Sequence, residues 1–268
     1  MMCRVLNVTR AGYYSWSKRT LSKRKIAEKK LMYLIREIHL SSRQTYGSPR
    51  IHAALLKREE TCSKGRVERI MKKFGISAKT PKRRKPKGSG IHKLPVAENL
   101  LQRDFSPLGP NKSWVGDITY IWTNEGWLYL AIVIDLFSRR VVGWAMDKNI
   151  DQKLVNRALS MAITHRRPAS GLISHTDRGS QYASRSHQEL LKQNHMICSM
   201  SRKGNCWDNA VAESFFKSLK NEFVYFQKFN YREKAKQEIF EWIECFYNQR
   251  RIHSSLGFKS PVQYEKAA

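Results

Sequence analysis

The apolar pattern of this chain changes near residue 110, from helical spacing before it to strand spacing after it, and this change strongly constrains the fold. Residues 114–122, 127–135 and 140–146 are rich in β-branched and aromatic side chains, which favour strands. Residues 123–126 join the first two runs and end in glycine, which is typical of a hairpin connection. Three strands with short connections predict an antiparallel meander.

Helices and strands alternate after the meander. The segments with helical spacing are residues 152–165, 185–193 and 209–223, and the short strand-like runs are residues 171–175 and 196–200. Three strands followed by helix, strand, helix, strand and helix predict an α/β fold with a mixed sheet and flanking helices. This is the order expected of an RNase H-like fold.

Residues 24–75 are predicted to be helical instead. Turn residues at 46–49 interrupt the helical spacing before a second apolar segment, and Ser63 is a candidate N-cap of a third helix that stops near Gly75. Two short helices joined by a turn, the second of them basic, are typical of a helix-turn-helix module that lies on DNA. The alternative is a solvated basic helix in a bundle. The candidate DNA-binding residues are Arg50, Arg66, Arg69, Lys72 and Lys73.

The charge distribution favours a polyanionic partner. Fifty Lys and Arg face 22 Asp and Glu, and residues 1–100 hold 26 of the basic residues but only 6 of the acidic ones. A field of this sign attracts nucleic acid at long range and releases counterions on binding. A basic surface of the ribosomal kind is the alternative. Attraction to a membrane surface is a weaker one, since no basic amphipathic helix adjoins a long apolar span.

Composition also divides the chain into segments. We predict a helical DNA-binding region over residues 1–78, a basic linker over 79–109, a catalytic core over 110–225 and a helical C-terminal tail over 226–268. Residues 79–93 lack apolar periodicity and are dense in Pro, Gly and positive charge, so they should remain extended. This linker either follows a phosphate backbone or is a solvated spacer without contacts.

Five cysteines are scattered along the chain, and none forms a C-x-x-C pair. An odd, dispersed set indicates reduced thiols in a cytoplasmic protein. His39, His52, Cys3 and Cys62 lack the paired spacing of a structural zinc site, so we expect no zinc. The sequence shows neither a signal peptide nor a run long enough to span a membrane.

Three carboxylates stand out from their surroundings. Asp117 lies inside an apolar strand, where Asp is disfavoured unless it faces solvent or an edge. Asp177 closes the strand that ends at His175, where α/β sheets place ligands, although turns and caps use Asp too. Glu213 lies on a predicted helix and shares a face with Lys217 and Lys220. The alternative for Glu213 is an ordinary solvent-exposed glutamate that interacts with Lys217, four residues later on the same helix.

Together the three carboxylates are harder to explain as separate surface features. Asp117, Asp177 and Glu213 could meet at one edge of the sheet and hold two Mg²⁺ ions through oxygen ligands. Two such ions can activate a hydroxyl and stabilise the leaving oxygen of an in-line displacement at phosphorus. Lys217 or Lys220 would then contact the DNA backbone beside the metals.

Other polar residues near these three are weaker candidates. Asp135 also ends an apolar strand, but the residues after it resemble a connection, so it ranks below Asp117. His175 could ligate metal, although such a histidine more often supports a ligand. Asp208 is interpreted as the N-cap of the helix that carries Glu213.

The segments around these carboxylates resemble a known family. Residues 114–120, 175–182 (HTDRGSQY) and 209–220 are similar to the DDE catalytic core shared by retroviral integrases and bacterial insertion-sequence transposases. Residues 46–51, 65–71 and 247–261 extend the resemblance to the second reading-frame product of the IS3 family. The similarity covers nearly the whole chain, and one departure is Thr176, where serine is more usual.

The resemblance implies a DNA transposase. Proteins of this kind use Asp, Asp and Glu with Mg²⁺ or Mn²⁺ to cut at the element's ends and join the 3′-hydroxyl to a target strand. The matching positions are Asp117, Asp177 and Glu213, and Lys220 falls on the family's basic position seven residues after the Glu. The implied partners are element-end and target DNA, further copies of the chain, and an upstream-frame protein or frameshift fusion.

Two other functions remain open at this point. One is a non-catalytic DNA-binding protein left by a decayed element, against which the intact acidic trio argues. The other is an RNase H-like nuclease without strand transfer, which would share the metal site and differ in its substrate.

Overall fold

The computed structural model describes residues 2–81, 97–102, 105–202 and 206–268. The chain forms two compact units, Met1–Lys79 and Thr80–Ala268. Most of the predicted linker over residues 79–109 lies outside the described residues. No helix in the described ranges is long and apolar enough to cross a membrane.

The first unit is helical. Its helices are α1 (Met2–Val5), α2 (Arg10–Ser17), α3 (Lys23–Ser41), α4 (Ser48–Leu56) and α5 (Lys64–Lys73). The predicted start of α5 is confirmed, because the Ser63 hydroxyl accepts a hydrogen bond from the backbone N–H of Arg66 at 3.3 Å. Pro49 lies in the first turn of α4, where a missing backbone N–H costs nothing. Apolar side chains of α3, α4 and α5 are buried, among them Ile35, Ile51 and Val67.

The second unit is built on a five-stranded mixed sheet, which confirms the predicted fold class. Its strands are β1 (Ser113–Thr123), β2 (Gly126–Asp135), β3 (Val141–Asp147), β4 (Ile173–Thr176) and β5 (Ile197–Met200). Their order is β3-β2-β1-β4-β5. The first three strands pair antiparallel, as the sequence predicted, whereas β4 runs parallel to β1 and β5 parallel to β4.

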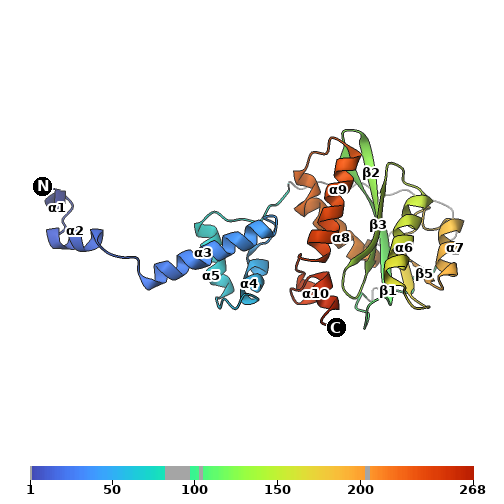
Figure 1. Ribbon diagram of the computed structural model, residues 1–268, viewed down its shortest axis with the longest axis horizontal. Coiled ribbons are helices and arrows are strands. Elements are labelled where there is room, and N and C mark those ends of the chain that lie inside the picture. Colours follow the sequence, from blue (N-terminus) through green and yellow to red (C-terminus); the bar gives the residue numbers. More distant parts are fainter. Residues whose placement is uncertain (1, 82–96, 103–104, 203–205) are drawn as a thin grey trace. The chain divides into compact units, whose positions relative to one another are not determined.

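Helices cover both faces of this sheet (Figure 1). One face carries α6 (Gln152–Arg166) and α7 (Arg185–Gln193), and the other carries α8 (Ala210–Glu222) and α9 (Arg232–Glu241). The C-terminal segment continues through a π-helical stretch and ends in α10 (Pro261–Glu265). The remaining short helical turns are η1 (Cys206–Asn209), η2 (Val224–Phe226), η3 (Trp242–Asn248), which is the π-helical stretch, and η4 (Ser254–Leu256).

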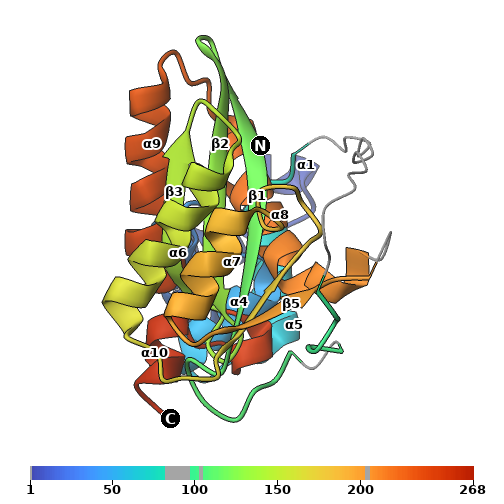
Figure 2. The ribbon, with the colours of Figure 1, turned by 90° about the vertical axis from the view of Figure 1, so that its right-hand side faces the viewer.

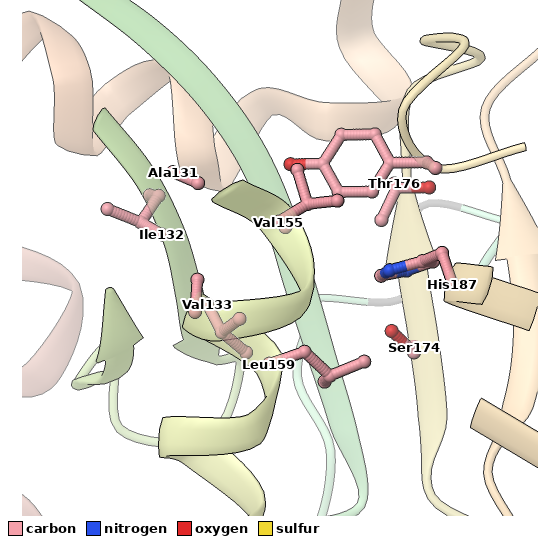
Figure 3. A pocket seen from close by; sticks show the side chains of 11 residues that line it. Ala131, Ile132, Val133, Val155, Leu159, Ser174, Thr176 and His187 are labelled. Atoms are coloured by element: carbon pink, nitrogen blue, oxygen red, sulfur yellow. The ribbon is translucent and has the colours of Figure 1, made fainter. Parts of the chain in front are cut away.

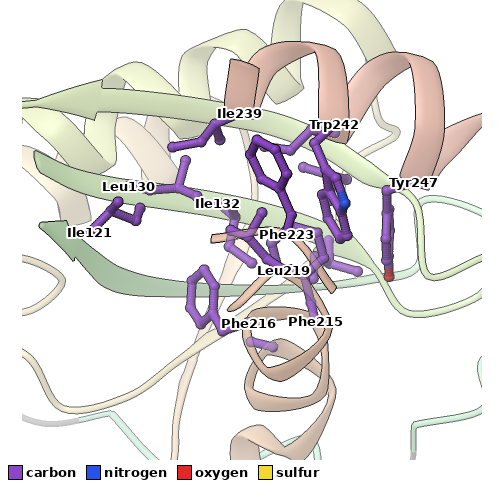
Figure 4. Close-up of a cluster of buried hydrophobic side chains, with 14 of the residues drawn as sticks. Ile121, Leu130, Ile132, Phe215, Phe216, Leu219, Phe223, Ile239, Trp242 and Tyr247 are labelled. Carbon is purple, nitrogen blue, oxygen red and sulfur yellow. The ribbon is translucent and has the colours of Figure 1, made fainter. Parts of the chain in front are cut away.

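Strand β2, which lies between β3 and β1, is buried on both sides, which explains its nearly continuous apolar sequence. Leu130 and Ile132 point to the α8 and α9 side, while Ala131 and Val133 point to the α6 side. Figure 4 shows the buried apolar cluster on the α8 and α9 side, in which Phe215 of α8 packs with residues of the sheet and of the C-terminal segment. Residues 226–268 therefore contribute to the core of the second unit.

Candidate active site

The pairing of β1 with β4 sets the position of two predicted carboxylates. The parallel register ends at Gly116 opposite Thr176, and the next residues of the two segments are Asp117 and Asp177. Beyond this point β2 is the only described strand that pairs with β1. The two aspartates therefore leave adjacent strands at the place where β4 ends, which is where α/β sheets hold ligands.

Gly116 allows this close approach of the two strands. A Cβ atom built on Gly116 would lie 3.2 Å from Cγ2 of Thr176 and 3.6 Å from Cε1 of Tyr182. The first distance is shorter than ordinary carbon–carbon contact. A larger residue at position 116 would thus move the strand that carries Asp177.

Helix α8 presents the third carboxylate. Its buried face, which includes Phe215 and Leu219, packs on the sheet, and Glu213 is exposed in its first turn. At the helix start, the Asn209 side-chain amide donates to the carbonyl of Gly116 at 3.3 Å. This contact ties the beginning of α8 to the strand residue that precedes Asp117.

Burial and charge act together on Asp117. Burial, and then the charges of Asp177 and Glu213, raise the pKa of Asp117 to about 8, against the opposing effects of the Ile118 N–H and Lys220. Burial also raises the pKa of Glu213. The negative charges of Asp177 and Glu213 thus repel that of Asp117, and a cation bound among the three carboxylates would reduce this repulsion.

The donor chemistry fits a hard divalent cation, because all three side chains offer carboxylate oxygens. In the described parts of the chain, however, no three His, Cys, Asp or Glu side chains are gathered closely enough to hold a metal ion as placed. Oxygen Oδ1 of Asp117 accepts from the Ile118 N–H at 2.7 Å, and Oδ1 of Asp177 from the Gly179 N–H at 2.9 Å. Metal binding therefore requires the side chains to draw together.

The two predicted lysines of α8 differ in their surroundings. Lys217 is exposed. Lys220 is half-buried, and its Nζ lies 4.6 Å from the ring centre of Tyr120. Burial lowers the pKa of Lys220, whereas the charge of Asp117 raises it. Lys220 thus lies between a carboxylate of the site and an aromatic ring that the sequence did not single out.

Two weaker candidates have structural roles. Both carboxylate oxygens of Asp135 accept hydrogen bonds, Oδ2 from the Asn111 N–H and Oδ1 from the Phe137 N–H, so the residue closes the end of β2. His175 is fully buried and shares a 2.8 Å hydrogen bond with the hydroxyl of Ser199. Burial lowers the pKa of His175 to about 4.

The interpretation of Asp208 as an N-cap is wrong. The residue preceding α8 is Asn209, and its side chain makes no cap hydrogen bond. The buried carboxylate of Asp208 instead binds the guanidinium of Arg202 and the side-chain amide of Asn99. Charge-assisted hydrogen bonds from the half-exposed Arg202 to this buried carboxylate outweigh the local preference of Asp for a helix start.

The candidate DNA-binding residues of the first unit separate into groups. Three of them share a groove of about 460 Å³ between α3 and α5, whose lining is Arg24, Glu28, Arg66, Arg69, Ile70 and Lys73. Lys73 pairs with Glu28 in this groove. Lys72 is exposed but does not line the groove, and Arg50 lies over the ring of Tyr46 at 5.5 Å.

Tyr182 is a further residue beside the site that the sequence did not single out individually. Its hydroxyl and Nε2 of His187 are buried without a hydrogen-bond partner among the described residues. Both line a cavity of about 10 Å³, measured as the space open to the centre of a water molecule, which suits a single water. Figure 3 shows His187 beside this cavity, with Val155 and Leu159 of α6. Burial and the charges of Asp117 and Asp177 raise the pKa of Tyr182.

The fold and the carboxylates together define a protein with an integrase core. Residues 107–206 match the family described as Integrase core domain, and residues 213–268 match a second family of that description. Residues 25–84 match the HTH-like domain. The HTH-like match spans α3, α4 and α5.

Full-length relatives define the family more narrowly. The transposase InsF for insertion sequence IS3A of Escherichia coli (strain K12) is 43% identical over 266 residues, covering 98% of this chain and 92% of its own. The uncharacterized 31 kDa protein of insertion element IS600 of Shigella sonnei is 41% identical over 265 residues, covering 99% and 97%. The chain belongs to the IS3 family of insertion-sequence transposases.

A solved structure is similar in fold. A chain of the simian T-cell lymphotropic virus intasome, determined in complex with the PP2A regulatory subunit B56 gamma, is 17% identical. The match covers 86% of this chain and 74% of that chain, with a TM-score of 0.51. At this identity the match shows a shared fold.

Proposed function

We propose that this transposase cuts DNA at the ends of its element and joins the freed 3′-hydroxyl to a target strand, with Asp117, Asp177 and Glu213 as the catalytic carboxylates. The observation that supports the assignment is the register of β1 and β4, which ends at Gly116 and Thr176, the residues directly before the two aspartates. The effect of Glu213 on the pKa of Asp117 supports the third member.

The cofactor in this proposal is Mg²⁺ or Mn²⁺, as two ions. Asp117, Asp177 and Glu213 would hold them with carboxylate oxygens. Bound there, the metals would supply Lewis-acid stabilisation of the attacking and leaving oxygens at phosphorus. The chain's own part is to orient the carboxylates, through the strand register and the packing of α8.

The DNA in this proposal is double-stranded and contacts both units. Near the carboxylates, Lys217 and Lys220 would bind the phosphate backbone. In the first unit, Arg50, Arg66, Arg69, Lys72 and Lys73 would bind DNA, with the groove between α3 and α5 as the main contact. Backbone contacts of this kind give affinity and position the protein without reading sequence.

Assembly and cellular context follow from the same proposal. Two DNA ends must meet one target, so we propose that several copies of the chain assemble on DNA in the bacterial cytoplasm. An upstream-frame protein or a frameshift fusion is the further proposed partner.

Strand cleavage and joining on end-containing DNA with Mg²⁺ test the carboxylates. Glu213→Gln keeps the size of the side chain and removes its charge, so cleavage and joining should fall on the order of 100-fold or more. Glu189→Gln is the matched control, because Glu189 lies exposed on α7 and pairs with Arg185. Unchanged activity of Glu213→Gln would exclude this residue from the catalytic site.

The same assay separates the alternatives. A nuclease without strand transfer would release cut ends and give no joined product. A non-catalytic DNA-binding protein would give neither product and would bind equally well as wild type and as Glu213→Gln. Cleavage followed by joining, both abolished together in the variant, is the result expected of the proposed function.

A further inference from the structure

Three aromatic rings are exposed together at the tip of the β1–β2 hairpin. Tyr120, Trp122 and Trp127 are 51%, 58% and 43% exposed. The ring of Trp127 stands edge-on to both others, with centre-to-centre distances of 5.1 Å to Tyr120 and 4.8 Å to Trp122. These three residues, here called the hairpin aromatic cluster, form one continuous apolar surface.

The sheet geometry explains why this cluster is open to solvent. Side chains alternate along a strand, so Tyr120 and Trp122 lie on the face to which buried Trp114 also belongs. Helices α6 and α7 cover that face nearer the middle of the sheet, and the hairpin extends beyond them (Figure 2). The same face is therefore core at one end and exposed at the other.

The hairpin tip is held in place by the start of α9. The guanidinium of Arg232 donates to the carbonyls of Glu125 and Trp127, the second bond measuring 3.1 Å. The N–H of Asn124 donates to the carbonyl of Phe229 at 2.9 Å. A surface fixed before its ligand arrives loses little conformational entropy on binding.

Lys220 connects the cluster to the carboxylates. Its ammonium lies 4.6 Å from the centre of the Tyr120 ring and interacts with the charge of Asp117. Asp117 and Tyr120 are three positions apart on β1, so their side chains leave opposite faces of the sheet about 10 Å apart along the strand. Beyond Gly116 no described strand pairs with β1 on its β4 side, and Lys220 of α8 reaches the Tyr120 ring at this open edge. Since about 10 Å is the rise of about three nucleotides in B-DNA, a strand that passes this edge would reach the cluster within a few nucleotides of the proposed catalytic carboxylates.

We propose that the hairpin aromatic cluster binds unpaired bases of the DNA strand whose phosphate lies at Asp117, by stacking them on Tyr120 and Trp122. Every base has a π-face, so stacking tolerates any sequence. Lys220 contacts the adjoining phosphate. The cluster therefore holds the strand end open beside the carboxylates. This proposal rests on the proposed function, since it needs DNA at that site.

Charge favours DNA over a second copy of the chain as the occupant. The chain carries a net charge of +28, so two copies repel each other unless a polyanion lies between them. The cluster consists of three side chains, whereas a stable interface between proteins uses about 20–30 residues on each side. The ammonium of Lys220 beside the Tyr120 ring attracts a phosphate group and repels a positively charged protein.

The experiment compares two tailed duplexes that differ only in their bases. The full chain is titrated, by fluorescence anisotropy at one salt concentration, with a duplex bearing a short thymine tail and with the same duplex bearing abasic sites in the tail. Stacking contributes enough per base that the thymine tail should bind about tenfold tighter or more. Because both ligands carry the same phosphates, their affinity ratio isolates the bases.

Variants locate the effect on the cluster. Trp122→Ala should reduce the affinity ratio to less than about twofold, whereas Trp122→Phe, which keeps a ring, should retain most of it. Trp16→Ala is the matched control, because Trp16 is 67% exposed and lies on α2 of the first unit. A thermal melt should show that Trp122→Ala remains folded, as expected for an exposed side chain.

Three results would overturn the proposal. They are equal binding of the two tails by wild type, an unchanged ratio in Trp122→Ala with self-association retained, and an unchanged ratio in Trp122→Ala with self-association lost, which would make the cluster a protein interface. Failure of the proposed function has a different signature. In that case wild type gives no joined product or Glu213→Gln remains active, while the two tailed duplexes still decide the role of the cluster.

Discussion

Gly116 and Thr176 are the last residues that pair between β1 and β4, and Cγ2 of Thr176 lies only 3.2 Å from where a Cβ atom of residue 116 would stand. Each of the two residues is followed directly by a proposed catalytic aspartate. The separation of Asp117 and Asp177 is therefore set by the contact between a glycine and a threonine methyl group.

Gly116→Ala should reduce cleavage while DNA binding is retained. The added methyl group would lie 3.2 Å from Cγ2 of Thr176, and overpacking of this kind costs about 1–3 kcal/mol. Adding Thr176→Ser removes that Cγ2 and keeps the hydroxyl that donates to the Asp177 carbonyl. Cleavage rates of the single and double variants provide the measurement. The double variant should recover, and a double variant as slow as Gly116→Ala would contradict this account.

Asp117→Asn should stabilise the metal-free protein at high pH. Because the pKa of Asp117 rises from 3.8 to about 8 on folding, the folded state keeps a proton that the unfolded state loses, and wild-type stability falls as pH rises between these values. A shift of even one pKa unit corresponds to about 1.4 kcal/mol, or roughly 3–6 °C in a domain of this size. Melting temperatures in EDTA at pH 4 and pH 8 test this. Parallel melting curves for wild type and variant across that range would argue against a buried, repelled carboxylate.

The fold followed from the sequence because its signals were local. The runs at residues 114–122 and 127–135 are rich in β-branched and aromatic side chains, and the cap at Ser63 needs only the next turn of helix, so strands, helices and their order were predictable. Predicting a mixed sheet needed one further inference from the connections. Strands joined by short connections pair antiparallel, whereas strands that follow a helix can pair parallel. Asp208 was misassigned because its partners, Asn99 and Arg202, belong to other segments.

The site was predictable in part. A carboxylate inside an apolar strand, such as Asp117, conflicts with local preference, and such conflicts point to function. The surroundings of Lys220 could not be predicted, because its contact with Tyr120 depends on how α8 crosses the sheet. The same is true of Tyr182, since no local pattern in the sequence shows that its hydroxyl is buried near two aspartates.

Arg66→Ala combined with Arg69→Ala should weaken DNA binding and flatten its salt dependence. Both side chains line the groove between α3 and α5, and loss of two phosphate contacts lowers the slope of log K against log salt by about 1.8. The cap of α5 survives, because Ser63 accepts from the backbone of Arg66. Titrations at several salt concentrations measure the slope. Arg58→Ala is the control, since Arg58 pairs with Glu37 outside the groove, and a slope that matches this control would leave α5 as a solvated basic helix.

Arg251→Met should destabilise the second unit and misplace α8. The Arg251 guanidinium, 3% exposed, donates to both carboxylate oxygens of Glu222 at 2.7 and 2.6 Å, so the variant removes two charge-assisted hydrogen bonds from a largely buried carboxylate. Such a loss costs about 3–5 kcal/mol, or on the order of 10 °C in melting temperature. Because Glu222 ends the helix that carries Glu213, cleavage should fall as well.

A double-mutant cycle separates this ion pair from simple packing. Arg251→Met with Glu222→Met replaces both charges with apolar side chains and should be more stable than Arg251→Met alone, since no buried carboxylate that has lost its guanidinium remains. Lys236→Met is the matched control, because Lys236 pairs with Glu233, which is 77% exposed, and exposed pairs contribute less than about 1 kcal/mol. Thermal unfolding of wild type, Arg251→Met, Glu222→Met and the double variant measures the coupling energy between the two residues. If the two substitutions at 251 and 222 were simply additive, the pair would not be what holds α8 in position.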